Sequence, residues 1–278
     1  MKIGFIDYYL DEWHANNYPT FFKERSGGTY EVCCAYGKID SPNGGMTNKE
    51  WSQKHNIPLA DTVEEVIEKS DAIIVLSPDN PEMHLELSDI ALKSGKPVYV
   101  DKTFAPDKET AVKIFKNADK HNTKCFSSSA LRFSSELDEI DINNIDRIYS
   151  EGPGPFGIYK IHQLEPIVRL MNAPAKRVMY TGDEKHPAMI IEFADGRTAQ
   201  MYHRDDENGS FKLTTVNAKN EAKHYEIKSD YFALFIDAVI KFFETNESPV
   251  PHEQTVDVMA LIEASDKAAK SPFEWIMV

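Results

Sequence analysis

The stretch from residue 72 to residue 111 constrains the fold more than any other part of the sequence. Its apolar runs at 72–76 and 98–100 are rich in β-branched residues and predict buried strands. Between them, apolar residues at helical spacing predict a helix that ends at Gly95. Lys102 comes just after the second strand. Because ligands bind beyond the carboxyl ends of the strands in open α/β sheets, Lys102 is a candidate site residue.

The same alternation of strand and helix extends through residue 125, with further strand candidates at 2–6 and 30–36. It predicts a Rossmann-like parallel sheet with helices on both faces. In the second half, short strand candidates follow one another with turns such as Asp195-Gly196 between them. We therefore expect an α/β protein with an N-terminal Rossmann-like domain (1–125) and a C-terminal α+β domain (126–278). The second domain has an open, mostly antiparallel sheet, and its final helix is free to pack back on the first domain.

Composition and charge exclude several classes of function. The formal net charge of −14 opposes binding to nucleic acid, which depends on Lys and Arg neutralising phosphates. No apolar run reaches the roughly 18 residues that a membrane helix needs, and the amino terminus does not have the pattern of a signal peptide. Three cysteines without a CxxC spacing predict free thiols. We expect a cytoplasmic protein whose partner is a small molecule rather than nucleic acid or a membrane.

Several motifs of the chain resemble those of the glucose-fructose oxidoreductase and inositol dehydrogenase family (Gfo/Idh/MocA), and the resemblance covers most of the chain. It rests on Ser77-Pro78 with His84, Gly95-Lys96-Pro97-Val98-Tyr99-Val100-Asp101-Lys102-Thr103, Ala130-Leu131-Arg132-Phe133, and Ser248-Pro249-Val250-Pro251 through Glu263-Ala264. Members of the family pair a dinucleotide-binding domain with an α/β domain built on one open sheet. They typically oxidise a hydroxyl of a sugar, cyclitol or related compound with NAD or NADP.

The resemblance implies a set of site residues. Lys102 matches the family's catalytic lysine and His162 its catalytic histidine, and Glu165 lies one helical turn later, where it can orient the ring. The expected contacts to NAD or NADP are Asp7, Tyr8, Tyr9, Ser77, Pro78 and Asp101. The expected substrate contacts are His14, Arg132 and Arg169, the last of which suits an anionic group.

The chain departs from the family pattern at several places, including Lys160 and Glu165, which stand where the family has a Gly and an Asp. The loop after the first strand lacks G-x-G-x-x-G, whose glycines let the backbone approach the cofactor diphosphate, and holds Asp7, Tyr9 and Glu12 at these positions. Ile158 stands where the family has a catalytic Asp, and Thr103 where it has a proline. The sequence therefore leaves open whether any dinucleotide binds.

Three functions remain open. The first is an NAD(P)-dependent oxidoreductase in which Lys102 and His162 handle the proton of a sugar-like hydroxyl in a cleft between the domains. The second is a lyase or isomerase on the same scaffold that uses Lys102, His162 and Glu165 together with the loop 7–14. This enzyme could also use a metal ion, with Asp7, Asp11, His14 and His84 as the ligands. Only the residue types point to such a site, so we expect no metal. The third is a sensor without catalysis.

The second sheet is expected to leave one face uncovered by helices. An uncovered apolar face favours self-association, so we expect a homodimer or homotetramer.

Overall fold

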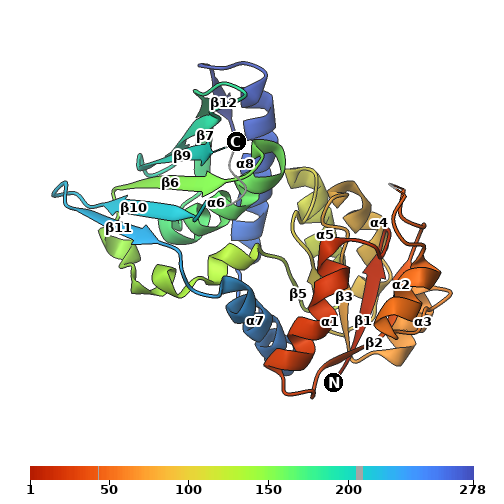
Figure 1. Cartoon of the computed structure of the whole chain (residues 1–278). Coiled ribbons are helices and arrows are strands. Elements are labelled where there is room, and N and C mark those ends of the chain that lie inside the picture. The colour runs from red at the N-terminus through yellow and green to blue at the C-terminus, as the bar shows by residue number, and fades with distance from the viewer. Residues whose placement is uncertain (43, 205–208) are drawn as a thin grey trace. The chain divides into compact units, whose positions relative to one another are not determined.

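The computed structural model describes residues 1–42, 44–204 and 209–278. The described residues group into two compact units (Figure 1). The first unit consists of Met1–Ser128 and Ile236–His252, and the second of Ser129–Phe235 and Glu253–Val278. None of the described helices combines the length and the apolar character that crossing a membrane requires.

The first unit is built on a parallel sheet with the strand order β2-β1-β3-β4-β5. Its strands are β1 (Lys2–Asp7), β2 (Glu31–Gly37), β3 (Ala72–Val75), β4 (Val98–Val100) and β5 (Cys125–Phe126). Its helices are α1 (Trp13–Arg25), α2 (Asn48–His55), α3 (Val63–Lys69), α4 (His84–Ser88), α5 (Lys108–Lys120) and most of α7 (Tyr231–Thr245). The predicted Rossmann-like sheet is confirmed.

The central strands of this sheet are apolar because the sheet is buried. All residues of β3 and β4 are buried, and so is β1 after its first residue. α3 packs so closely on β1 that a side chain at Gly4 would meet the Val66 side chain at 2.4 Å. Since the strands run in parallel, the residues that follow β1, β3 and β4 emerge at one edge of the sheet, where ligands bind in folds of this kind.

Two local predictions differ in their outcome. Asp107 caps α5 as expected, because its carboxylate accepts a hydrogen bond from an amide of the first helical turn at 2.7 Å. The helix expected to end at Gly95 is interrupted: α4 ends at Ser88, and a 3₁₀ turn follows at Ala91–Lys93. The Asn117 side chain donates to the carbonyl of the residue after Ser88 at 3.3 Å, and so occupies an oxygen that a continuous helix would use.

The second unit contains a sheet with the strand order β11-β10-β6-β9-β8-β7-β12 (Figure 1). Its elements are β6 (Arg147–Pro153), α6 (Phe156–Met171), β7 (Ala175–Tyr180), β8 (Ala188–Phe193), β9 (Thr198–Arg204), β10 (Lys212–Val216), β11 (Ala222–Glu226), α8 (His252–Ala269) and β12 (Trp275–Met277). β6 and β9 pair in parallel, and the other neighbouring strands are antiparallel, which confirms the expected mostly antiparallel sheet. α6 packs against β6 and β9. The edge strand β12 was not predicted.

Candidate active site

The loop between β1 and α1 carries buried carboxyl groups. Asp7, the last residue of β1, is completely buried, and its Oδ1 accepts a hydrogen bond from the Tyr8 amide at 2.7 Å. Its Oδ2 has no hydrogen-bond partner among the described residues. Glu12 is also buried and caps α1, since its carboxylate accepts hydrogen bonds from the His14 amide at 2.6 Å and from the Ala15 amide. A buried acid therefore stands at each end of this loop.

A histidine from α1 pairs with an aspartate at the end of β4. The His14 Nδ1 atom contacts the Asp101 carboxylate, and both side chains are buried. The other oxygen of Asp101 accepts hydrogen bonds from the Tyr99 hydroxyl at 3.0 Å and from the Lys102 amide at 2.8 Å. The His14 ring stacks on Tyr18 with centroids 4.9 Å apart. Its Nε2 makes no hydrogen bond to the described residues.

Burial changes the proton affinity of these acids. Desolvation, reinforced by the charge of Glu12, raises the pKa of Asp7 well above its usual range. Desolvation also raises the pKa of Glu12 to about 7, although the His14 ring and the Ala15 amide work against it. Burial alone would raise the pKa of Asp101 too, but the contact with His14 holds this pKa below its usual value. Two acids with a raised pKa thus lie beside one with a lowered pKa, a pattern typical of acid–base sites.

Lys102 follows β4 and is half-buried. Its ammonium group makes no hydrogen bond or ion pair with the described residues, and the peptide bond between Lys102 and Thr103 is cis. The nearby His84 is completely buried, with its ring nitrogens 2.6 Å from the Leu76 carbonyl oxygen and 3.1 Å from the Phe104 carbonyl oxygen. His84 therefore braces the loops that follow β3 and β4, whereas the Lys102 ammonium is available to a ligand.

The connection from β2 to α2 braces the loop after β1. The Asn48 side chain accepts a hydrogen bond from the Leu10 amide at 3.1 Å and donates to the Gly37 carbonyl at 3.0 Å. A side chain at Gly37 would meet Asn48 at 2.4 Å, so this close approach requires glycine. The Asp11 carboxylate accepts a hydrogen bond from the Met46 amide at 2.7 Å. These contacts specify the conformation of the loop that carries the buried acids.

This loop does not fit the diphosphate of a dinucleotide. In dinucleotide-binding folds the diphosphate binds the amides at the amino end of the first helix, which glycines allow it to approach. Here the Glu12 carboxylate occupies amides of that turn, and Tyr9 and Leu10 fill the loop with exposed fractions of 8% and 0%. A diphosphate would also be repelled by Asp7 and Glu12 whenever these are ionised. The end of β1 is therefore not a cradle for NAD or NADP.

The other expected cofactor contacts follow β1 and β3. Tyr8 is half-buried in the loop after β1. Ser77 is buried and has a φ of 87°, which is rare for serine. Its hydroxyl donates to the Asn80 carbonyl at 3.2 Å, so that Ser77 and Pro78 form a tight turn after the strand. The fold places these residues at the carboxyl edge of the sheet, and their contact with a cofactor stays a prediction.

In the second unit, α6 carries the other predicted catalytic residues. The His162 Nδ1 atom lies 2.7 Å from the Ser129 hydroxyl. One turn later Glu165 accepts hydrogen bonds from the Arg132 guanidinium at 2.9 Å and from the Ser129 amide at 3.3 Å. Arg169 donates to the Arg132 carbonyl at 2.7 Å and pairs with an aspartate. The structure thus brings His162, Glu165, Arg132 and Arg169 together, and Ser129 contacts the first two of them.

Sequence reasoning missed two features of these clusters. Ser129 was not singled out, although it directly precedes the family-like segment Ala130–Phe133, which folds as a 3₁₀ turn. That position was the signal that could have identified it. The pairing of His14 with Asp101 was not predicted either, because the two residues lie 87 positions apart in the chain. The roles that we expected for them, substrate contact and cofactor contact, stay predictions.

The described residues form no metal centre, since no group of three or more His, Cys, Asp and Glu side chains is placed to hold an ion. Two of the ligands considered from the sequence already have protein partners. Asp11 accepts hydrogen bonds from Met46 and Asn16, and His84 contacts backbone carbonyls.

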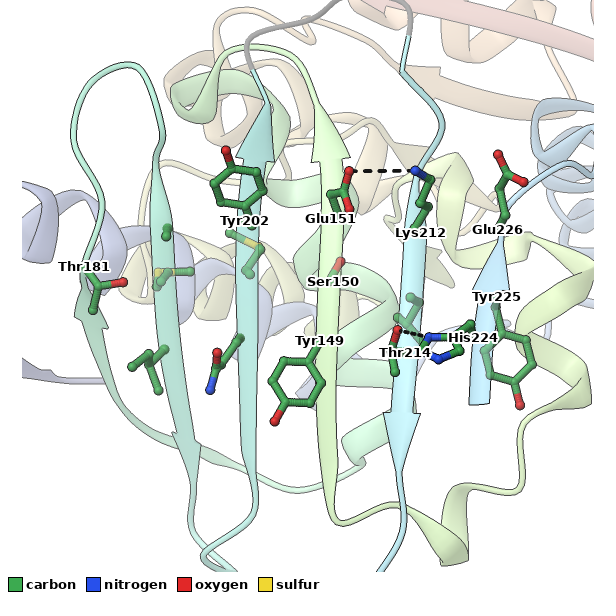
Figure 2. A pocket seen from close by; sticks show the side chains of 16 residues that line it. Tyr149, Ser150, Glu151, Thr181, Tyr202, Lys212, Thr214, His224, Tyr225 and Glu226 are labelled. Carbon is green, nitrogen blue, oxygen red and sulfur yellow. Dashed lines mark hydrogen bonds and ion pairs between the residues drawn. The ribbon is translucent and has the colours of Figure 1, made fainter. Parts of the chain in front are cut away.

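A hollow of about 750 Å³ lies on the sheet face of the second unit that Figure 2 shows. Glu151 and Lys212 approach to 3.9 Å on neighbouring strands there, and Tyr149 and Tyr202 are 38% and 39% exposed. None of the predicted catalytic residues lines this hollow. We therefore treat it as a surface feature separate from the candidate active site.

Neither a family model nor a curated protein matches this sequence. Solved structures match its fold over the whole chain. A probable dehydrogenase from Thermotoga maritima has a TM-score of 0.78 and 14% identity, covering 100% of this chain and 98% of that chain. UDP-N-acetylglucosamine 3-dehydrogenase GnnA from Acidithiobacillus ferrooxidans has a TM-score of 0.76 and 13% identity, with 98% of each chain covered.

The WlbA dehydrogenase from Bordetella pertussis, solved in complex with NADH and UDP-GlcNAcA, has a TM-score of 0.73 and 12% identity. The match covers 100% of this chain and 98% of that chain. At such identities the likeness shows that this chain has the fold of these dehydrogenases. Its chemistry has to be argued from its own residues, because one fold hosts many reactions.

Proposed function

We propose that this protein is a lyase or isomerase that moves protons on a small molecule bearing hydroxyl and carbonyl groups. The observation that carries the proposal is the buried pair of His14 and Asp101 at the carboxyl edge of the first sheet, directly before Lys102. A carboxylate that holds one nitrogen of an imidazole orients the ring and makes the other nitrogen a better base. Dehydrogenase folds bind a diphosphate in this region. In this protein the same region contains residues suited to acid–base chemistry.

Each residue of the pair and its neighbours has a distinct role. Asp101 holds His14 through Nδ1, so that Nε2 takes a proton from a carbon next to a carbonyl group. The Lys102 ammonium donates a hydrogen bond to the carbonyl oxygen, on which negative charge develops as the C–H bond breaks. Glu12, with a pKa of about 7, is suited to return a proton near neutral pH. Return of the proton to the adjacent carbon gives an isomer, and loss of a neighbouring hydroxyl as water gives a lyase product.

The second unit contains a polar cluster of its own around His162. Ser129 lies within hydrogen-bonding distance of His162 Nδ1, at 2.7 Å, and this contact orients the ring. Glu165 is nearly inaccessible, at 1% exposure, and its ion pair with Arg132 stabilises the turn that carries Ser129. We propose that, within the second unit, His162 is a catalytic residue and Arg169 an anchor for an anionic group.

Deuterium exchange tests this function. The protein is incubated in deuterated water with ketoses, aldoses, amino sugars, keto-cyclitols and keto acids, and NMR follows replacement of hydrogen at each carbon. We expect exchange in at least one compound, and its loss in His14→Gln. The matched control is His121→Gln, at the end of α5, where exchange should persist. Exchange that continues unchanged in His14→Gln would contradict the proposed role.

The fold likeness to dehydrogenases favours a second candidate, an NAD(P)-dependent oxidoreductase that acts on a sugar-like hydroxyl. One structure of this fold was solved with NADH. Lys102 would then handle the hydroxyl proton. This candidate requires a diphosphate to bind without the α1 amides that Glu12 caps. Reduction of NAD or NADP by one compound of the same panel, lost in Lys102→Met and retained in His14→Gln, would favour it over the first.

We also propose that the protein is a homodimer or homotetramer that associates through the sheet face in Figure 2. Tyr149 and Tyr202 expose aromatic rings on this face, and Glu151 and Lys212 supply both signs of charge. A face that packs on a second copy of itself has to be self-complementary in this way. Light scattering after size exclusion should give more than one copy for the wild type and a monomer for the double variant Tyr149→Glu/Tyr202→Glu. A monomeric wild type at micromolar concentration would contradict the proposal.

A further inference from the structure

The edge strand β2 contains two adjacent cysteines whose sulfur atoms lie close together. Successive side chains of a regular strand point to opposite faces of the sheet, which would separate them. The register between β1 and β2 shifts at this point, because Ile3 pairs with Val32 and Gly4 with Cys34. Cys33 therefore has no partner in β1 and forms a bulge, and a bulge re-aims a side chain. As a result, the sulfur atoms of Cys33 and Cys34 are 3.6 Å apart.

The two thiols differ in exposure and acidity. Cys33 is half-buried and Cys34 is buried. The hydrogen bond with Cys34 lowers the pKa of Cys33 to about 7, and the same contact together with burial raises the pKa of Cys34. Cys125 is buried elsewhere in the unit, and burial raises its pKa. Only at the bulge does an accessible sulfur with thiolate character lie beside a second thiol among the described residues, as a reactive pair requires.

We propose that Cys33 and Cys34 form a dithiol site that peroxides oxidise reversibly to a vicinal disulfide. The Cys33 thiolate attacks the peroxide, the O–O bond breaks, and Cys33 becomes a sulfenic acid while water or an alcohol leaves. The Cys34 sulfur then attacks the Cys33 sulfur, the S–O bond breaks, and the hydroxyl leaves as water with the Cys34 proton. The two thiols lose two electrons in total, and the peroxide takes them up.

The site is suited to a reversible modification. Neighbouring Cα atoms are about 3.8 Å apart, which is shorter than the separation of about 4.4 to 6.8 Å that most disulfides have. Such a bond is strained, and strained disulfides are the more easily reduced ones. The strand also leads to the candidate active site, because the Lys38 amide donates to the Asp7 carbonyl at 3.0 Å and the Ile39 amide to the Tyr8 carbonyl at 2.9 Å. The modification itself does not depend on which reaction the protein catalyses.

Peptide mass analysis tests the proposal. Native protein is treated with a small excess of hydrogen peroxide, alkylated and digested with trypsin. Cleavage after Arg25 and Lys38 places both cysteines in the peptide 26–38, and cleavage after Lys124 and Arg132 places Cys125 in the peptide 125–132. We expect the peptide 26–38 to lose two hydrogen atoms and both alkylation sites, and to regain both sites with dithiothreitol. The peptide 125–132 should remain alkylated throughout.

Single variants define the order of events. In Cys34→Ser, oxidation of Cys33 should stop at a sulfenic acid, which dimedone traps. If serine destabilises the strand, Cys34→Ala is used instead, with the same expected result. In Cys33→Ser, Cys34 should stay fully alkylated, and Cys125→Ser should behave as the wild type. The proposal is overturned if Cys33 becomes a sulfinic acid while Cys34 stays free. Full alkylation of both cysteines under conditions that oxidise the glutathione thiol, or a disulfide to Cys125, would also overturn it.

Discussion

The ends of β1 and β4 lie at the same edge of one parallel sheet, yet they carry different chemistry. After β4 the chain has Asp101 and Lys102, a segment that resembles the lysine motif of the Gfo/Idh/MocA family. After β1 it has buried acids and a capped helix in place of glycines. The ends are joined by the contact of His14 with Asp101. The helix that follows β1 therefore contacts the segment after β4, and its first amides are capped rather than open to a diphosphate.

This difference shows that two strand ends at one sheet edge can have opposite requirements for the residues around them. A diphosphate needs open amides and small residues, because its charge is bound by the backbone. An acid–base pair needs the opposite conditions, since burial and fixed partners shift the pKa values of its side chains. At the end of β1 the chain meets only the second set of conditions.

The largest loss of turnover is expected from removing the contact between His14 and Asp101. Asp101→Asn keeps the shape of the side chain and removes the charge that holds His14. Turnover in the deuterium-exchange assay should fall by about 10²- to 10⁴-fold, the range typical of general acid–base catalysis. Asp119→Asn on α5 is the matched control and should keep wild-type turnover, with unchanged circular dichroism for both variants. Full activity of Asp101→Asn would break the link between the loops.

The second-largest loss of turnover is expected from a change at Lys102, the residue that follows Asp101 at the end of β4. Lys102→Met keeps the length of the side chain and removes the ammonium group. We expect turnover to fall by about 10²-fold, since loss of one donor to a developing oxyanion typically costs about 10²- to 10³-fold. Lys113→Met, on the exposed side of α5, serves as the control and should leave turnover unchanged. Equal rates for Lys102→Met and the wild type would show that this end does not act on the substrate.

A pH profile of stability tests the end of β1. Burial raises the pKa of Glu12 from its ordinary 4.5 to about 7, so the folded state holds this proton more tightly than the unfolded state. The stabilising contribution is complete below pH 4.5 and is lost as the pH rises to about 7. In Glu12→Gln the melting temperature should therefore fall less steeply across this window than in the wild type. The exposed variant Glu109→Gln should show the wild-type slope, and parallel curves for all three proteins would refute a buried acid at this position.

The smallest effect is expected in the second unit. Ser129→Ala removes a hydroxyl that lies 2.7 Å from His162 Nδ1, and one hydrogen bond is worth about 1 kcal/mol. Turnover should fall by about tenfold or less, with a shift in the pH profile that Ser129→Thr restores. Ser134→Ala removes another buried hydroxyl, which donates to the Leu131 carbonyl, and should leave the pH profile unchanged. An unshifted profile in Ser129→Ala would show that His162 is not positioned in this way.

Much of the fold could be predicted because its signals are local. Apolar runs of strand length, the Asp107 cap and the turn at Asp195-Gly196 act within a few residues, and each is present in the structure. The break after α4 was not predictable, because the carbonyl at the break is taken by a side chain from α5. Local pattern also does not report a register shift, so the bulge at Cys33 was not anticipated.

The candidate site could be predicted only in part. The position of Lys102 follows from the rule that parallel strands expose their carboxyl ends at one edge. The missing glycines showed that the loop after β1 was unusual. What replaced them could not be read from the sequence, since the contact of His14 with Asp101 spans 87 positions and depends on how α1 approaches β4.

The central claim is that the end of β1 does not bind a dinucleotide. Isothermal titration of the wild-type protein with NADH and with NADPH tests it most directly, because the measurement requires neither a substrate nor turnover. We expect no saturable heat up to millimolar concentrations of either nucleotide. Saturable binding of one equivalent per chain at micromolar concentrations, weakened in Lys102→Met, would contradict it and favour the oxidoreductase.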